Sequence, residues 1–277
     1  MQERSRALAW LCVLALVLAS CAARQPGDPL RPGFNLYSVD DDIEIGRMVS
    51  DQADEELDIV GDPALQDYIA ELGRRLASDV RTGPFPYTFA LVRDDSINAF
   101  ALPGGPIYIH TGLVAAAANE AQLAGVMAHE ISHVALRHGT SQASRASLLQ
   151  IPAILASEVL GQASVGAQAG QLGLSLGLSS VLLNYSRNAE READALGARV
   201  MAEAGYDPIE MAAFFETLEA EGGARGPEFL ASHPSPGNRT ATVRAEIQTF
   251  PSSGPYTAST GRFGTIRQAV VRLNEGQ

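Results

Sequence analysis

The chain has 277 residues, of which 46% are apolar and 19% charged, so extensive disorder is excluded and a hydrophobic core can form. Acidic residues outnumber basic ones by 32 to 20, which gives a net charge of −12 and argues against a general nucleic-acid binder. The two cysteines, Cys12 and Cys21, both lie near the N-terminus, so no disulfide framework is available to the rest of the chain.

Residues 1–20 have the parts of a secretory signal. A short basic start is followed by an apolar run from Ala7 to Leu18 and then by small residues. A helix that spans a bilayer needs about 20 apolar residues, so this run is short for a membrane anchor. We predict a cleaved signal peptide over residues 1–20.

The end of that run is more specific. Leu18-Ala19-Ser20-Cys21 resembles the bacterial lipobox, in which the cysteine is lipidated; an ordinary signal peptide with a chance cysteine is the alternative. The proline- and glycine-rich stretch behind it suits a tether, which we expect over residues 21–38. Ala22 follows the cysteine where retention in the inner membrane usually favours aspartate. The resemblance therefore points to the periplasmic face of the outer membrane, with Cys21 as the lipid anchor.

Apolar spacing in the first half of the mature chain predicts two helices and a small sheet. The helices are expected over residues 40–57 and from Asp62 onward, with Asp62 as N-cap and Pro63 in the first turn. Three short strands are expected at residues 87–92, 98–102 and 106–110. One long helix is then predicted from Thr111 to His138, ended by Gly139.

The second half is expected to be helical. Residues 148–183 are apolar but interrupted by polar side chains, which favours a buried or groove-lining helical pair over a membrane span. Further helices are predicted at residues 188–205, 208–221 and 236–248, and a loop at 251–261.

The sequence that carries chemistry is His129-Glu130-Ile131-Ser132-His133, an HExxH pattern inside the strongest predicted helix. Residues four apart share a helix face, so both imidazoles can reach one zinc ion at about 2.0–2.1 Å. Glu130 then faces the water that attacks the substrate. The alternative, two histidines on a helix surface, is disfavoured by the apolar residues around the pattern.

A catalytic zinc needs a third protein ligand and one open position. Glu190 and Asp194 lie one turn apart on a predicted helix face, which suits a ligand and a carboxylate that accepts the N–H of a ligating histidine. Glu192 lies about 200° away from Glu190 around the helix, so only one of them can face the metal. From spacing alone, a solvated helix face explains these glutamates equally well. The other candidate ligands are the histidines His110, His138 and His233.

The HExxH sequence followed by Ser186-Arg187-x-x-Glu190-x-x-Ala193-Asp194 resembles the M48 group of gluzincin metallopeptidases. This group includes HtpX-like proteases, CAAX-processing endopeptidases and periplasmic quality-control proteases. The resemblance covers most of the mature chain and extends to residues 62–66, 72–76, 98–105 and 232–234 with Arg239. The chain is most similar to the compact, lipid-anchored periplasmic kind.

The resemblance implies a fold and a set of site residues. The fold would be α+β, a mostly helical zincin (gluzincin) fold with a small three-stranded sheet over the HExxH helix. The metallopeptidase domain would cover residues 39–250, followed by a C-terminal tail over 251–277. One Zn²⁺ per chain would be held by His129, His133 and Glu190, and substrate would lie along the edge strand with Asn98 and Ala99 by strand addition.

The implied activity is that of a zinc-dependent endopeptidase for unfolded or misassembled envelope proteins, with Glu130 as the proton acceptor. His233 is expected to assist at the oxyanion, and the family suggests that it can also swing onto the fourth zinc position and hold the enzyme off. Arg239 is expected to support either role. His110 and His138 are expected to be structural.

Two other functions fit the same residues. A chaperone or assembly factor for outer-membrane proteins could use the zinc-bound groove with little turnover, and the sequence does not separate it from a protease, because metal binding needs the same ligands as catalysis. A structural lipoprotein with a degenerate site is disfavoured, since all catalytic residue types are present.

Overall fold

A mixed three-stranded sheet lies beside the helix that carries the HExxH sequence. Its strands are β1 (Thr88–Val92), β2 (Ala99–Ala101) and β3 (Pro106–His110), in the order β1-β3-β2. β3 runs parallel to β1 and antiparallel to β2, so β2 is an edge strand of this sheet. The three strands lie where the sequence predicts them, to within a residue or two at their ends.

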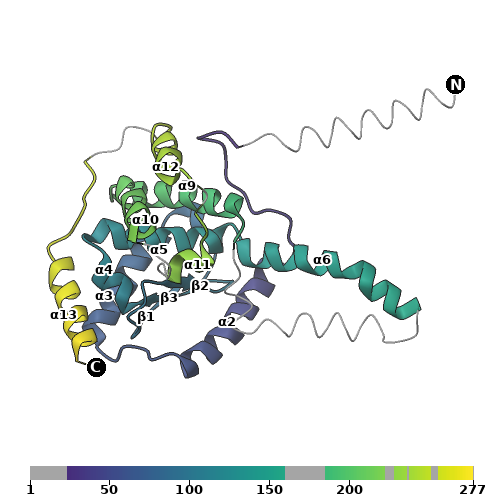
Figure 1. Ribbon diagram of the computed structural model, residues 1–277, viewed down its shortest axis with the longest axis horizontal. Helices are drawn as coiled ribbons and strands as arrows, with labels where there is room; N and C mark the ends of the chain where they lie inside the picture. Colours follow the sequence, from purple (N-terminus) through teal and green to yellow (C-terminus); the bar gives the residue numbers. More distant parts are fainter. Residues whose placement is uncertain (1–23, 160–184, 222–227, 236, 251–254, 277) are drawn as a thin grey trace.

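The computed structural model describes residues 24–159, 185–221, 228–235, 237–250 and 255–276. The signal peptide, Cys21 and residues 160–183 of the apolar stretch therefore lie outside the described residues. Figure 1 shows helices packed around the small sheet, with one helix, α6, extending away from this body. None of the helices in the described part combines the length and hydropathy needed to cross a membrane.

Ten α-helices and one short 3-10 helix are described outside those gaps. They are α2 (Val39–Glu56), α3 (Pro63–Ala77), η1 (Val80–Thr82), α4 (Thr111–Ala116), α5 (Glu120–Ala135), α6 (His138–Val159), α9 (Arg187–Glu203), α10 (Ile209–Glu221), α11 (Glu228–Ser232), α12 (Arg239–Ile247) and α13 (Phe263–Glu275). The predicted start of α3 is confirmed: Pro63 opens the helix, and the Asp62 carboxylate accepts hydrogen bonds from the first backbone N–H groups.

Helix α5 is buried on all sides, between α3, α9, α10 and the sheet. Small residues permit these close contacts. A Cβ at Gly125 would lie 2.6 Å from Met211 on α10, and one at Gly197 of α9 would lie 3.3 Å from the backbone nitrogen of His129. The Gly197 contact brings the backbone of α9 against α5 at the first histidine of the HExxH sequence, which lets α9 carboxylates reach it.

The prediction of one continuous helix from Thr111 to His138 is wrong, because the chain breaks twice. Asn119 caps a new helix by accepting a hydrogen bond from the backbone of Gln122. The second break is at Arg137, which has a left-handed φ of 56°. Its guanidinium donates to the Asp42 carboxylate at 2.6 and 3.0 Å. This contact with α2 stabilises the turn against the intrinsic helix preference of the sequence.

The segment expected to be a tether makes specific contacts with the folded body. Arg24 donates to Glu246 on α12 at 3.0 Å, and the Phe34 carbonyl accepts from Ser141 on α6 at 2.8 Å. The Leu36 N–H donates to the Ser144 hydroxyl at 2.9 Å. Polar side chains of α6 and α12 thus hold this proline- and glycine-containing segment in place.

The C-terminal segment expected to be a tail contains helix α13, which packs on α4 and α3. Phe263 and Val270 are buried in the main core. Ile266 and Leu273 pack beside them, and the four residues form one helix face at three- and four-residue spacing. Arg267 adds a hydrogen bond to the Ala115 carbonyl at 2.9 Å.

Candidate metal centre

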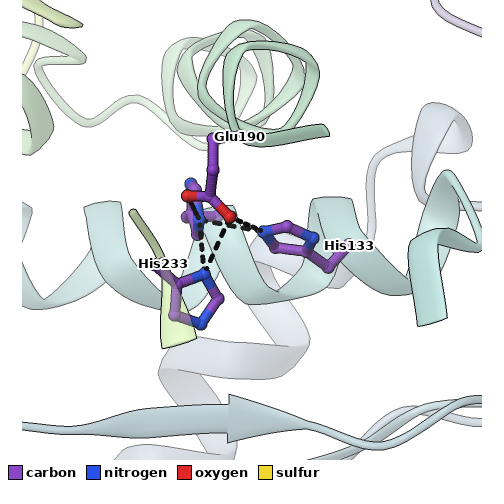
Figure 2. Close-up of side chains that lie close together, drawn as sticks. His133, Glu190 and His233 are labelled. Carbon is purple, nitrogen blue, oxygen red and sulfur yellow. Dashed lines mark hydrogen bonds and ion pairs between the residues drawn. The ribbon is translucent and has the colours of Figure 1, made fainter. Parts of the chain in front are cut away.

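Four buried side chains converge between α5, α9 and the chain that follows α11. The ligand atoms of His129, His133, Glu190 and His233 all lie within 4.8 Å of one another, so this group could hold a metal ion. Figure 2 shows Glu190 reaching down from α9 toward His133 on α5 and toward His233.

The spacing of these atoms fits a small tetrahedral cation. The Nε2 atoms of His129 and His133 are 3.0 Å apart, and they lie 3.3 and 3.4 Å from the Glu190 oxygens. The Nδ1 atom of His233 lies 3.3 Å from His129 Nε2 and 3.2 Å from Glu190 Oε1. Four atoms about 2.1 Å from one ion at tetrahedral angles are about 3.4 Å apart. Imidazole and carboxylate are also the donors that zinc takes in catalytic sites.

The two glutamates of α9 point in different directions, as the helical period requires. Glu190 is buried among the histidines. Glu192 contacts His138 instead, with 29% of its side chain exposed. Glu190 is thus the α9 glutamate that the structure brings to the HExxH histidines.

Asp194 and Arg239 hold the opposite side of His129. Asp194 Oδ1 lies 2.9 Å from Nδ1 of His129, so the nitrogen that faces the ligand group is left free to bind. Arg239 donates to Asp194 at 2.9 and 3.0 Å and to Glu190 at 3.1 Å. Burial alone would raise the pKa of Asp194, but the charge of Arg239 and the hydrogen bond with His129 lower it. Asp194 therefore stays ionised and orients the imidazole.

Glu130 lies between the two HExxH histidines in sequence and is 1% exposed. Its Oε1 atom has no hydrogen-bond partner among the described residues and lies 3.4 Å from Nε2 of His233. Burial raises the pKa of Glu130 to about 7. A buried carboxylate with a free oxygen beside a metal site is suited to accept a proton.

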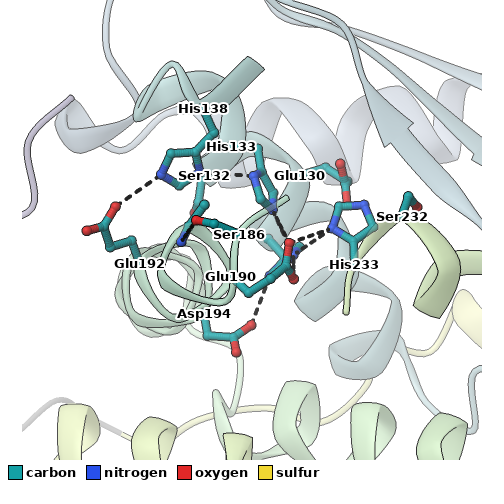
Figure 3. A network of polar contacts seen from close by, with 12 residues as sticks. Glu130, Ser132, His133, His138, Ser186, Glu190, Glu192, Asp194, Ser232 and His233 are labelled. Atoms are coloured by element: carbon teal, nitrogen blue, oxygen red, sulfur yellow. Dashed lines mark hydrogen bonds and ion pairs between the residues drawn. The ribbon is translucent and has the colours of Figure 1, made fainter. Parts of the chain in front are cut away.

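His233 occupies the fourth position of the group. Its backbone N–H donates to the Phe229 carbonyl at 2.9 Å, and its ring stacks on the Phe229 ring at 4.4 Å. Figure 3 shows the imidazole between Glu190 and Glu130. The ligand group and Glu130 are each no more than 2% exposed, so a substrate cannot reach Glu130 in this arrangement.

The edge strand β2 presents its backbone differently from the expectation. The Asn98 carbonyl accepts from the His110 N–H at 3.1 Å, and the Leu102 N–H donates to Pro106 at 2.8 Å. In an antiparallel ladder the residues between these, Ala99 and Ala101, direct their backbone groups away from β3. The carbonyl of Asn98 is thus used inside the sheet. Ala99 and Ala101 direct their backbone groups to the other edge, where the Ala101 N–H interacts with the Glu130 carboxylate.

Two contacts around His133 were not expected from the sequence. His138, expected only to be structural, places its Nδ1 2.9 Å from Nδ1 of His133 and its Nε2 3.2 Å from the Glu192 carboxylate. Tyr185 stacks on the His133 ring with 4.0 Å between the centroids. The fifth histidine, His110, lies in the sheet and contacts Ser96 at 2.8 Å, outside the ligand group.

The chain is similar in sequence to proteins that are named as proteases. The chain is 36% identical to the beta-barrel assembly-enhancing protease of Escherichia coli K12 over 213 residues, which cover 75% of this chain and 44% of the relative. It is 35% identical to the protein of that name from Yersinia pestis over 215 residues, again 75% of this chain and 44% of the relative. It is 29% identical to the mitochondrial metalloendopeptidase OMA1 of Schizosaccharomyces pombe over 221 residues, 77% of this chain and 63% of the relative.

The chain spans about half the length of the bacterial relatives that it matches. The model of peptidase family M48 matches residues 63–247, more than half of this chain and the whole region from α3 to α12. On this match and the similarity to the bacterial relatives, the chain belongs to peptidase family M48.

Proposed function

We propose that this M48 chain is a zinc-dependent endopeptidase that cleaves unfolded or misassembled envelope proteins. The observation that supports it best is the convergence of His129, His133 and Glu190 on one point, with the unpartnered Glu130 oxygen next to it. A buried carboxylate oxygen without a hydrogen-bond partner needs an explanation, and the acceptance of a proton from the attacking water supplies one.

His129, His133 and Glu190 would hold the zinc ion, which would polarise the peptide carbonyl and make water easier to deprotonate. Glu130 accepts the proton of the attacking water and passes it to the leaving amine. Asp194, which is hydrogen-bonded to Arg239, accepts a hydrogen bond from the Nδ1–H group of His129 and so fixes the orientation of that ring.

Substrate backbone would pair with the free edge of β2. Ala99 and the carbonyl of Ala101 offer backbone groups there, and the Ala101 N–H interacts with Glu130. Strand addition reads the backbone more than the side chains. Extended segments are available in unfolded proteins and not in folded ones. This geometry, with the names of the bacterial relatives, supports misassembled outer-membrane polypeptides as the substrate class.

Zinc removal tests the proposal directly. Protein prepared from Ala22 onward should cut an unfolded outer-membrane polypeptide into fragments, stop when a chelator removes the metal, and regain activity with added zinc. Fragments are measured by mass spectrometry, and aggregation of the same polypeptide by light scattering. Suppressed aggregation without fragments at full zinc occupancy would instead identify a chaperone that uses the same groove.

We also propose that Cys21 carries the lipid anchor on the periplasmic face of the outer membrane. Arg24, three residues later, is bound to Glu246 on α12, and three residues extend at most about 11 Å. A lipid at Cys21 would therefore hold the catalytic body close to the membrane surface.

Cys21→Ser should move the protein from the membrane fraction to the soluble fraction and leave the activity of the purified protein unchanged. The reason is that the lipobox cysteine is the attachment point and lies outside the metal centre. Immunoblots of carbonate-washed membranes measure this. A variant that stays in the membrane would mean attachment elsewhere, with residues 148–183 the first region to test.

A further inference from the structure

The contact between His133 and His138 joins two Nδ1 atoms at 2.9 Å. Two imidazole nitrogens form a hydrogen bond only when one carries a proton and the other a lone pair. His133 directs its Nε2 toward His129 and Glu190, on the metal side. A neutral His133 that binds metal through Nε2 therefore carries its proton on Nδ1. This Nδ1–H group donates a hydrogen bond to His138.

The tautomer of His133 determines the tautomer of His138. His138 accepts at Nδ1, so its own proton is on Nε2, which lies 3.2 Å from the Glu192 carboxylate. The other oxygen of Glu192 accepts from the Asn188 amide at 2.7 Å, which holds the carboxylate in place. A single chain of donors and acceptors thus runs from His133 through His138 to Glu192, as Figure 3 shows.

The contacts of His133 resemble those of the other HExxH histidine, His129. His129 is oriented directly by Asp194, which Arg239 holds. His133 has no such carboxylate within the described residues, and His138 connects it to Glu192 instead. Both HExxH histidines are then oriented by α9, one directly and one through a second imidazole.

Three features of the local fold hold His138 and His133 together. The left-handed turn at Arg137 ends α5 and places His138 at the start of α6, beside His133. Tyr185 covers the face of the His133 ring, so the ring plane is held by stacking and its edge by the hydrogen bond. His138 is 8% exposed, so water competes little for this contact.

We propose that His138 and Glu192 are positioning residues that fix the tautomer and orientation of His133 as a zinc ligand. The proposal rests on the proposed function, because it takes His133 as a ligand. Outer hydrogen-bond partners of ligating histidines typically contribute about 10- to 100-fold to metal affinity.

The test compares zinc affinity with the stability of the metal-free protein. His138→Leu should weaken zinc binding about 10- to 100-fold in a chelator competition, with little change in the Tm of the metal-free protein. His138→Asn, whose side-chain oxygen can accept the Nδ1 proton of His133, should recover most of the affinity. Glu203→Ala, an exposed glutamate of the same helix α9, is the control and should bind zinc like the parent.

Glu192→Ala should weaken zinc binding less than His138→Leu, and adding it to His138→Leu should change nothing further, because the two residues act in series. Parental affinity in His138→Leu would overturn the proposal. The proposal would also be overturned if zinc affinity and the Tm of the metal-free protein fell together and His138→Asn did not recover the affinity. His138 would then only connect α6 to α9.

The unmodified protein provides a second measurement that does not depend on variant folding. Nitrogen-15 NMR of the zinc-loaded chain should show His133 protonated at Nδ1 and His138 protonated at Nε2. A proton on Nδ1 of His138 would overturn the proposal. Failure of the parent to bind zinc would contradict the proposed function itself, whereas a parent that binds zinc with the opposite tautomers would contradict the positioning role alone.

Discussion

Glu130→Gln is expected to lower peptide cleavage by about 100-fold or more while leaving the zinc content unchanged. Loss of a positioned proton acceptor costs about 10²- to 10⁴-fold in rate. Glutamine has nearly the same shape as glutamate, and the Oε1 atom of Glu130 gives up no hydrogen bond with the described residues. The amide cannot accept the proton of the attacking water, so chemistry should fail in a folded, metal-loaded protein.

The measurements are zinc content by mass spectrometry and initial rates on an unfolded polypeptide. Glu120→Gln is the matched control, because Glu120 is also a buried carboxylate of α5 but accepts from Tyr206 and Thr260, away from the metal centre. It should retain its rate per folded molecule. Cleavage that persists in Glu130→Gln would contradict the proposed mechanism, and loss of zinc in that variant would assign Glu130 a part in building the centre.

The parts of the centre that lie on single helices could be predicted from the sequence. The period of the helix fixes which of His129, His133, Glu190 and Glu192 can share a face, whatever surrounds them. The sequence also predicts the three strands, because alternation and turn residues are local signals.

The contacts of His138 could not be predicted, because they depend on the turn at Arg137. That turn is stabilised by Asp42, 95 positions away in sequence, and local propensity favours a continuous helix through it. Helix α13 is a different case. Its apolar residues recur at helical spacing in the sequence, so this helix could be predicted from a local signal.

His233→Ala is the second variant with a large expected effect, and two roles of the imidazole predict opposite signs. If His233 only donates to the oxyanion, its loss should cost about 10²- to 10³-fold in kcat. If it mainly blocks the open ligand position, its loss should increase cleavage. The geometry favours the second: Nδ1 lies within 3.3 Å of ligand atoms of His129 and Glu190, as a fourth ligand would.

The burial of the centre gives the direction of the expected change. In this arrangement Glu130 and the ligands are no more than 2% exposed, so the centre must open before a substrate can bind. If His233 holds it closed, the competent molecules are those in which His233 has moved. Observed affinity falls in proportion to the fraction of molecules that are competent to bind. Removing the imidazole should therefore raise cleavage of a short peptide above the parent rate, at most by about the inverse of that fraction.

Phe229→Leu is the matched control, because it removes the ring on which His233 stacks and keeps the imidazole itself. It should loosen His233 and raise cleavage less than His233→Ala does. Initial rates on a short peptide and on an unfolded protein measure both variants at saturating zinc. A fall of about 100-fold in His233→Ala would assign the residue to the oxyanion, and rates within about twofold of the parent on both substrates would show that it has neither role.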